Sequence, residues 1–341
     1  MRASPGWPAC LSRDGSRRFV SLALTPRVKL AAVTLDRRRN AIWIASALLV
    51  ACGTSGDGRS GDPAAPAPSA PSASPVAAPA PVLDPNPFKL PASPLRLDKG
   101  GRVFTVSDAM LAGAKLGSTL VLQAATVVGL DGELLVIENK SGPSYKVHPA
   151  YAIAVPDAAA IRPSDPVITE GAGLMRHAVV KKHVKDRVTV RYTDGDMRIA
   201  ELVVKSTRFL RQNEGLLPGN FAALGDGETL RHVLLVSTFD DAGEKKWLAL
   251  GAGGAAMVVP ERSLEPIPIK LAVRSGAVVL AEHNGVLRKA TVTNASDPGV
   301  FTVRYERAGR PVTVGWGSIM PLAQDKPKAS PRPSGAGSQP M

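Results

Sequence analysis

A pattern of four repeats constrains what this chain can fold into more than any other feature of its sequence. The segment Val121–Val127 returns as Val286–Val292, which is 286 − 121 = 165 residues, or three steps of 55, further along the chain. Two intermediate copies, at 174–180 and 229–235, fill the gap. Units of about 55 residues are too small to be secure alone, so we expect each repeat to pack on its neighbours. The alternative is one large sandwich whose strands are similar by chance.

The residues inside each repeat predict β-structure. Runs such as Leu134–Ile137, Val188–Tyr192 and Phe301–Tyr305 are short and β-branched, and turn signals separate them. Only Ser107–Leu116 is typical of a helix, with Ser107 as its N-cap and Gly117 as its stop. The predicted fold class is therefore all-β, with about four tandem, small, five-stranded, barrel-like repeats. Their predicted ranges are 95–156, 157–214, 215–268 and 269–322.

Repeat 4 displays the layout of a repeat most clearly. From Gly276 to Leu322 it reads as a glycine, strands separated by turns, and a short end segment. Repeat 2, with its turn at 192–195, is similar, and both resemble Tudor-like or Src-homology-type small β-barrels; repeats 1 and 3 resemble them more loosely. Tudor-like domains hold methylated Lys or Arg in an aromatic cage, so the resemblance implies Tyr192, Tyr305 and Trp316 as candidate aromatic contacts. Packing of Tyr192 and Tyr305 in the barrel core or rim is the alternative.

The N-terminal segment predicts where the protein is located. Arg37–Asn40 forms a positive n-region, and Ala41–Ala51 is an apolar run of 11 residues. Such a run is too short to cross a bilayer as a helix, which takes about 20 residues. The run ends in Leu49-Val50-Ala51-Cys52, which resembles the lipobox of bacterial lipoproteins. This resemblance implies cleavage of the leader 1–51 and a lipid anchor, such as palmitate, on Cys52. An ordinary cleaved signal peptide and a short buried helix are the alternatives.

A tether is predicted to follow the lipidated cysteine. The leader is long for a signal peptide, which favours a true start near Val28 or Leu30. Residues 52–94 are rich in Ala, Pro and Ser, with eleven prolines between Pro63 and Pro94, so we expect a disordered linker that reaches up to roughly 100 Å. The tail 323–341 is expected to be disordered as well. Gly53 favours, by resemblance, sorting to the outer membrane, facing the periplasm or the cell surface.

Charge and cysteine content exclude several function classes. Residues 1–51 hold nine Lys or Arg and two Asp or Glu, so the mature chain keeps 13 − 7 = +6 of the net charge. This is thin support for nucleic-acid binding, which also conflicts with export. Cys10 and Cys52 are the only cysteines, so the mature chain has no disulfide, no thiolate nucleophile and no cysteine metal site. His177 and His183 lie about 20 Å apart along an extended strand, and we predict no metal and no cofactor.

Strand alternation places basic residues on one face of repeat 2. If Ala178 and Val180 point into the barrel, then His177, Lys181 and His183 point outwards. The candidate binding site for an anion or a partner comprises Arg176, His177, Lys181, Lys182, His183, Lys185 and Arg187. The alternative is a solvated strand face, whose positive charges are compensated by Asp186, Asp194, Asp196 and Glu201.

These observations favour binding over catalysis, and we predict no catalytic residues. The preferred hypothesis is a membrane-anchored envelope lipoprotein that acts as a non-catalytic binding or scaffold module. Its partner would be another envelope protein or an anionic envelope polymer such as peptidoglycan. The alternative is an envelope hydrolase on a β scaffold, which would use Asp240 and Asp241 with a histidine.

Overall fold

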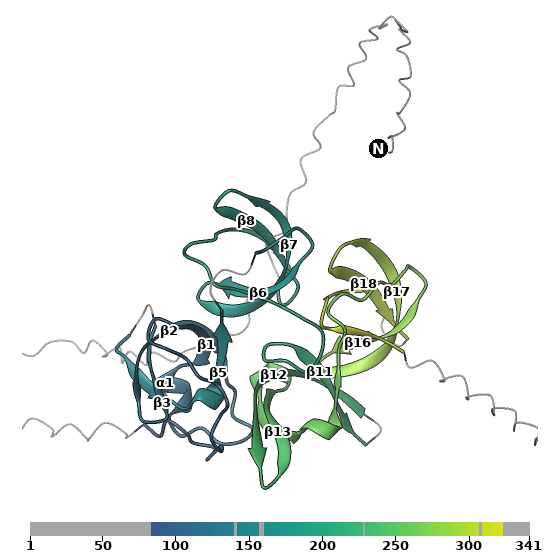
Figure 1. Cartoon of the computed structure of the whole chain (residues 1–341). Coiled ribbons are helices and arrows are strands. Elements are labelled where there is room, and N and C mark those ends of the chain that lie inside the picture. Colours follow the sequence, from purple (N-terminus) through teal and green to yellow (C-terminus); the bar gives the residue numbers. More distant parts are fainter. Residues whose placement is uncertain (1–82, 140–141, 157–159, 228, 307–308, 323–341) are drawn as a thin grey trace, which may run out of the picture. The chain divides into compact units, whose positions relative to one another are not determined.

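The computed structural model describes residues 83–139, 142–156, 160–227, 229–306 and 309–322, which belong to one unit spanning residues 75–341. The leader, the lipobox with Cys52, linker residues 52–82 and the tail 323–341 lie outside the described residues. The described part is all-β, as predicted, with strands β1 to β20 and the single α-helix α1 (Figure 1). None of its helices is long and apolar enough to cross a membrane.

Each repeat contributes five strands. Repeats 1 and 2 contain β1 (Arg102–Val106), β2 (Leu122–Asp131), β3 (Leu134–Glu138), β4 (Tyr145–Val147), β5 (Ala152–Val155), β6 (Pro166–Gly171), β7 (Leu174–Val184), β8 (Arg187–Tyr192), β9 (Ile199–Val203) and β10 (Phe209–Arg211). Repeats 3 and 4 contain β11 (Phe221–Asp226), β12 (Thr229–Asp241), β13 (Glu244–Leu250), β14 (Ala256–Pro260), β15 (Leu264–Pro266), β16 (Val278–His283), β17 (Val286–Asp297), β18 (Val300–Tyr305), β19 (Val312–Gly315) and β20 (Ile319–Pro321). Short 3-10 turns occupy 149–151, 252–254 and 261–263.

The strands of every repeat are arranged in the same order. The fifth strand pairs with the first, and the first, second, third and fourth then follow as an antiparallel meander. The fourth and the fifth strand each have one partner, so the ladder is not closed into a barrel within the described residues. Near its middle, each second strand has a bulge, as between Val180 and Lys182 in β7. A bulge bends the strand and increases its local twist.

The four repeats are joined in two pairs. β2 meets β7 at Gln123 and Leu174, and β12 meets β17 at Arg231 and Val286. Repeats 1 and 2 thereby form one 10-stranded sheet, and repeats 3 and 4 form a second with the same connectivity. Repeats 2 and 4 hold equivalent positions in the two sheets, and they are the two repeats with the clearest sequence resemblance.

The helix and the linker differ from what the sequence predicts. α1 spans only Asp108–Leu111, and the Ser107 side chain forms no cap hydrogen bond. Gly113 turns the chain with a φ of 68°, and residues 117–120 then lie extended beside repeat 3, so the prediction of a helix to Leu116 is wrong. Linker residues 83–94 are also more ordered than predicted, because Leu90 is buried and the Phe88 ring packs against Tyr151 at 5.4 Å.

Candidate functional site

The predicted basic site in repeat 2 is largely neutralised by carboxylates. Arg176 Nε donates to Asp194 Oδ1 at 2.6 Å, and its guanidinium carbon lies 4.5 Å from the centre of the Tyr192 ring. Arg187 pairs with Glu201. The alternative of a strand face answered by its own acidic residues is therefore correct for these two arginines.

Lys181 is neutralised by a residue from another repeat. It forms an ion pair with Asp297 of repeat 4, which also pairs with Arg191. The two ring nitrogens of His183 lie 3.0 and 3.1 Å from the carbonyl oxygens of Ile161 and Lys185. Of the predicted cations, Lys182 and Lys185 are exposed and form no ion pair within the described part of the chain.

His177 is buried, so the prediction that it is accessible is wrong. Ala178 and Val180 do point into the core of repeat 2, and the predicted alternation is correct at these positions. The opposite face is covered by repeat 3, because the His177 ring lies 4.3 Å from that of Phe221 and only 3% of the residue is exposed. His177 Nε2 lies 2.7 Å from the carbonyl oxygen of Gly219. The outer face of one repeat is thus the interface with the next.

The predicted aromatic contacts do not form a cage. Tyr192 and Tyr305 are buried, and their hydroxyls donate to the backbone oxygens of Glu170 and Glu282 at equivalent places in repeats 2 and 4. Core packing is therefore the correct alternative for both tyrosines, and neither ring is accessible to a ligand. Trp316 is partly buried and packs against the core of repeat 4.

A stack of three rings joins repeats 2, 3 and 4. Phe221 lies between His177 and His232, with ring-centre distances of 4.3 and 4.4 Å. His232 Nε2 lies 2.7 Å from the carbonyl oxygen of Gly317. A carbonyl only accepts, so this nitrogen and the equivalent one of His177 both carry hydrogen and donate. The stack borders a cavity of about 750 Å³ with mixed polar and apolar walls, which is lined by residues of all four repeats.

The charged and imidazole groups at this cavity, Asp194, His232 and Glu282, already have partners. Asp194 Oδ2 accepts from the backbone nitrogen of His177 at 2.7 Å. Burial by itself would raise the pKa of Asp194, but the hydrogen bonds from His177 and Arg176 outweigh it and lower this pKa. No three His, Cys, Asp or Glu side chains gather as a metal site among the described residues. Both imidazoles donate to backbone carbonyls, which is the role of an interface between repeats.

The residues of the alternative hydrolase hypothesis lie elsewhere. Asp240 and Asp241 are at the tip of the β12–β13 hairpin, where Asp241 Oδ2 lies 2.8 Å from Lys246 Nζ. Asp240 is exposed. The stacked histidines, by contrast, contact Gly219 and Gly317, so the contacts of these residues favour structural roles.

The buried His148 and the partly buried His232 predict a stability that depends on pH. Burial lowers the pKa of both His148 and His232 below the ordinary value of 6.5, and His148 Nδ1 accepts a hydrogen bond from Ala150 N. The unfolded chain therefore binds more protons below about pH 6.5, and stability is lost as the pH falls through that value. We expect thermal unfolding to show a lower Tm at pH 5 than at pH 7.5. The double variant His148→Gln/His232→Gln should flatten this dependence, whereas His183→Gln, at an exposed position, should retain it.

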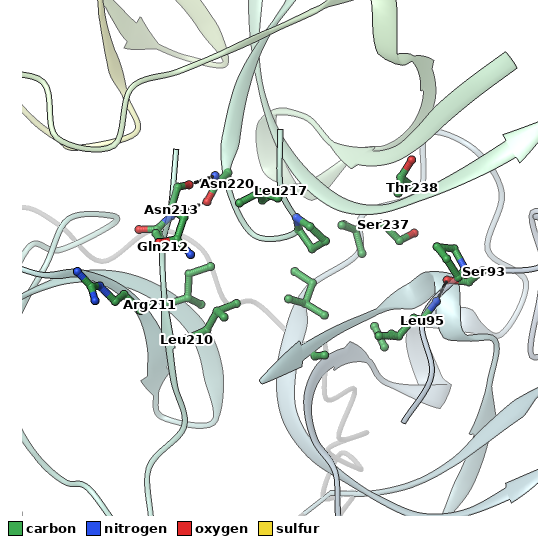
Figure 2. Close-up of a pocket in the computed structure, with 17 residues that line it drawn as sticks. Ser93, Leu95, Leu210, Arg211, Gln212, Asn213, Leu217, Asn220, Ser237 and Thr238 are labelled. Atoms are coloured by element: carbon green, nitrogen blue, oxygen red, sulfur yellow. Dashed lines mark hydrogen bonds between the residues drawn. The ribbon is translucent and has the colours of Figure 1, made fainter. Parts of the chain in front are cut away.

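A second cavity, of about 370 Å³, has apolar walls (Figure 2). Its apolar lining comes from the end of the linker and from repeats 1, 2 and 3, and includes Leu95, Ile153, Ile168, Leu210, Leu217 and Val236. Asn220 Nδ2 donates to the carbonyl oxygens of Asn213 and Gly215, and Ser237 Oγ donates to that of Ala150. The polar side chains are thus bonded within the protein, and the cavity presents mainly hydrocarbon. Its volume is within the range of about 300–1,000 Å³ that is usual for ligand pockets.

Sequence reasoning missed this apolar cavity. Its walls come from several repeats, and residues 93–94 belong to the segment that was expected to be disordered. The signal that could have found it is the set of apolar residues Phe88, Leu90 and Leu95 at the end of the linker, since a purely disordered tether has little need of them.

No protein-family model and no curated protein matches this chain. Among solved structures, the chain is similar to the crystal structure of Arabidopsis thaliana AGDP1 AGD34, with 14% sequence identity and a TM-score of 0.22. The similarity covers 35% of this chain and 84% of that chain.

Proposed function

We propose that this chain is a non-catalytic binding module of the cell envelope, anchored by lipid on Cys52, whose partner is another envelope protein. The observation that carries the proposal is the apolar cavity of about 370 Å³ bordered by repeats 1, 2 and 3. Protein interfaces are dominated by a few apolar or aromatic anchors that fill such pockets. The cavity therefore suits an aliphatic or aromatic side chain of a partner.

A protein partner is favoured over an anionic polymer because most of the predicted cations are already paired. Arg176, Lys181 and Arg187 hold ion pairs with Asp194, Asp297 and Glu201. Recognition of a polyanion requires a concentrated basic surface that is free to release counterions. Contact through an apolar anchor does not require free basic residues.

The location of the module rests on the lipobox and the tether. Lipid on Cys52 would hold the module at the membrane, and the Ala/Pro/Ser-rich segment would give it reach. The strand order shared by the four repeats supports their proposed relation to Tudor-like or Src-homology-type domains. Mass spectrometry of the mature N-terminal peptide tests the anchor, because an unmodified peptide that spans Cys52 would contradict it.

The partner proposal is tested by blocking the mouth of the cavity. Leu217 lines the cavity and is 39% exposed, so Leu217→Glu should fold while placing a charge at the apolar entrance. Leu116→Glu, at a residue that is 55% exposed and does not line the cavity, is the matched control. We expect the wild-type chain and L116E to retain the same envelope protein from detergent extracts at low and at high salt, and L217E to lose it.

Purified sacculi serve as the second bait in this experiment. Retention on sacculi that high salt abolishes, together with equal protein capture by L217E and the wild-type chain, would contradict a protein partner held in the cavity. Such a result would favour an anionic polymer bound through the remaining free lysines.

A further inference from the structure

The fourth strand lies at an edge of the ladder in each repeat. In repeat 3 the start of this edge is covered by another segment of the chain. Gly117 N donates to Ala256 O at 2.8 Å, and Ala256 N donates to Ser118 O at 2.9 Å. A further bond joins Leu120 N to Gly254 O at 2.9 Å. Residues 118–120, which come from repeat 1, therefore lie along the start of β14, where Thr119 and Ala255 form an isolated antiparallel bridge.

The equivalent edges of repeats 1 and 4 are also engaged in part. His148, directly after β4, donates its backbone N–H to Pro85 O at 3.0 Å. At the end of β19, Gly315 lies so close to repeat 2 that an added Cβ would be 2.1 Å from the carbonyl oxygen of Thr193. Three of the four repeats thus have the end of the fourth strand covered by another part of the molecule.

β9 in repeat 2, like the other fourth strands, pairs with one strand, β8. Within the described part of the chain no backbone hydrogen bond joins β9 to another repeat, and three of its five residues are exposed. Ile199 is 58% exposed and Val203 is 38% exposed, so this edge strand presents two β-branched apolar side chains to solvent. Glu201, between them, is the single charged residue on this exposed row.

The backbone of β9 also has groups available for pairing. Tyr192 N donates to Arg198 O, and Val204 N donates to Asp186 O, so the even-numbered residues of β9 face β8. Hydrogen-bonded pairs alternate along an antiparallel ladder. The N–H and C=O groups of Ile199, Glu201 and Val203 consequently point away from β8.

The charge around this edge is positive. Lys182, Lys185 and Lys205 are exposed and form no ion pair within the described part of the chain, whereas Glu201 is neutralised by Arg187. Lys185 lies in the turn between β7 and β8, and Lys205 follows the end of β9. The exposed Asp186 lies in the same turn, so the three lysines exceed the acidic residues that are not already paired, and an added strand with acidic residues meets a net positive edge.

We propose that β9 docks an extended, acidic segment of a partner protein as an additional strand, with the segment's apolar side chains lying over Ile199 and Val203. Main-chain hydrogen bonds to the odd-numbered residues supply affinity, and the exposed side chains and lysines supply preference. The arrangement repeats at an intermolecular level what residues 117–120 do for β14. This docking edge is separate from the apolar cavity and does not depend on it.

The probe is a labelled peptide of sequence Glu-Val-Thr-Val-Thr-Val-Glu, added to the full chain and followed by fluorescence anisotropy. Glu201→Pro removes a backbone N–H that faces away from β8, a position where an edge strand tolerates proline. Glu201→Ala keeps that N–H and is the matched control. We expect binding to the wild-type chain and E201A, and at least about tenfold weaker binding to E201P.

A second variant and a second readout make the test independent of how E201P folds. Ile199→Ser removes an apolar side chain that is 58% exposed without adding a charge and should also weaken binding, as should replacing both glutamates of the peptide by lysine. Hydrogen exchange should show peptide-dependent protection of the amides of Ile199, Glu201 and Val203. L217E should bind the peptide as the wild-type chain does, which separates this edge from the cavity.

Several results would overturn the proposal. They are no binding of the peptide up to about 1 mM, equal binding to I199S and the wild-type chain, or protection of amides elsewhere than in β9.

Discussion

Replacing Gly315 with alanine is expected to lower the free energy of unfolding by about 3 kcal/mol or more, because the added methyl group has no space. A Cβ at this position would lie 2.1 Å from the carbonyl oxygen of Thr193 and 2.8 Å from its carbonyl carbon. Both are backbone atoms, so no side-chain rotation can relieve the overlap. Either β19 or the β8–β9 loop has to move, and the contact between repeats 2 and 4 is lost.

Urea unfolding of the full chain measures this effect, and Gly309→Ala is its control. Gly309 has no atom within 4 Å of an added Cβ and, like Gly315, does not adopt a positive φ. The two variants therefore add the same methyl group and differ only in what surrounds it. If G315A were as stable as G309A, the close approach of repeats 2 and 4 at Thr193 would be wrong.

The sequence predicted the features of this fold that depend on local pattern. The all-β class and the alternation at Ala178 and Val180 agree with the structure, because side chains on neighbouring strand positions point to opposite faces whatever surrounds them. The burial of His177 could not be predicted in this way. Its direction was predicted correctly, but burial depends on which element covers that face, and the cover comes from Phe221 of the next repeat.

The partners of the candidate site residues could not be predicted for the same reason. Asp297, which pairs with Lys181 and Arg191, is more than 100 residues away in sequence, so no local pattern identifies it as their partner. The apolar cavity likewise needs walls from repeats 1, 2 and 3 together. In a chain of repeats, the sequence period predicts the strands of each repeat. The contacts between repeats then decide which surfaces remain accessible for binding.

A buried ion pair within repeat 2, whose arginine also bonds to repeat 1, leads to the second large effect. Arg208 is 7% exposed, and its Nη2 donates to Ala125 O at 2.9 Å and to Thr126 Oγ1 at 3.0 Å. Its Nη1 lies 3.5 Å from Oε2 of Glu170, which is 8% exposed. Arg208 is thus the charged contact through which the end of repeat 2 holds β2 of repeat 1.

Arg208→Met should therefore lower the free energy of unfolding by about 3–5 kcal/mol, because it leaves the Glu170 carboxylate buried without a counter-charge. The double variant Arg208→Met/Glu170→Leu removes both charges and should regain most of that loss. Arg187→Ala, which breaks an exposed pair with Glu201, is the control and should have little effect. Chemical unfolding of the four proteins measures these differences. A double variant no more stable than R208M would show that the hydrogen bonds of Arg208 to β2, and not its charge, hold the two repeats together.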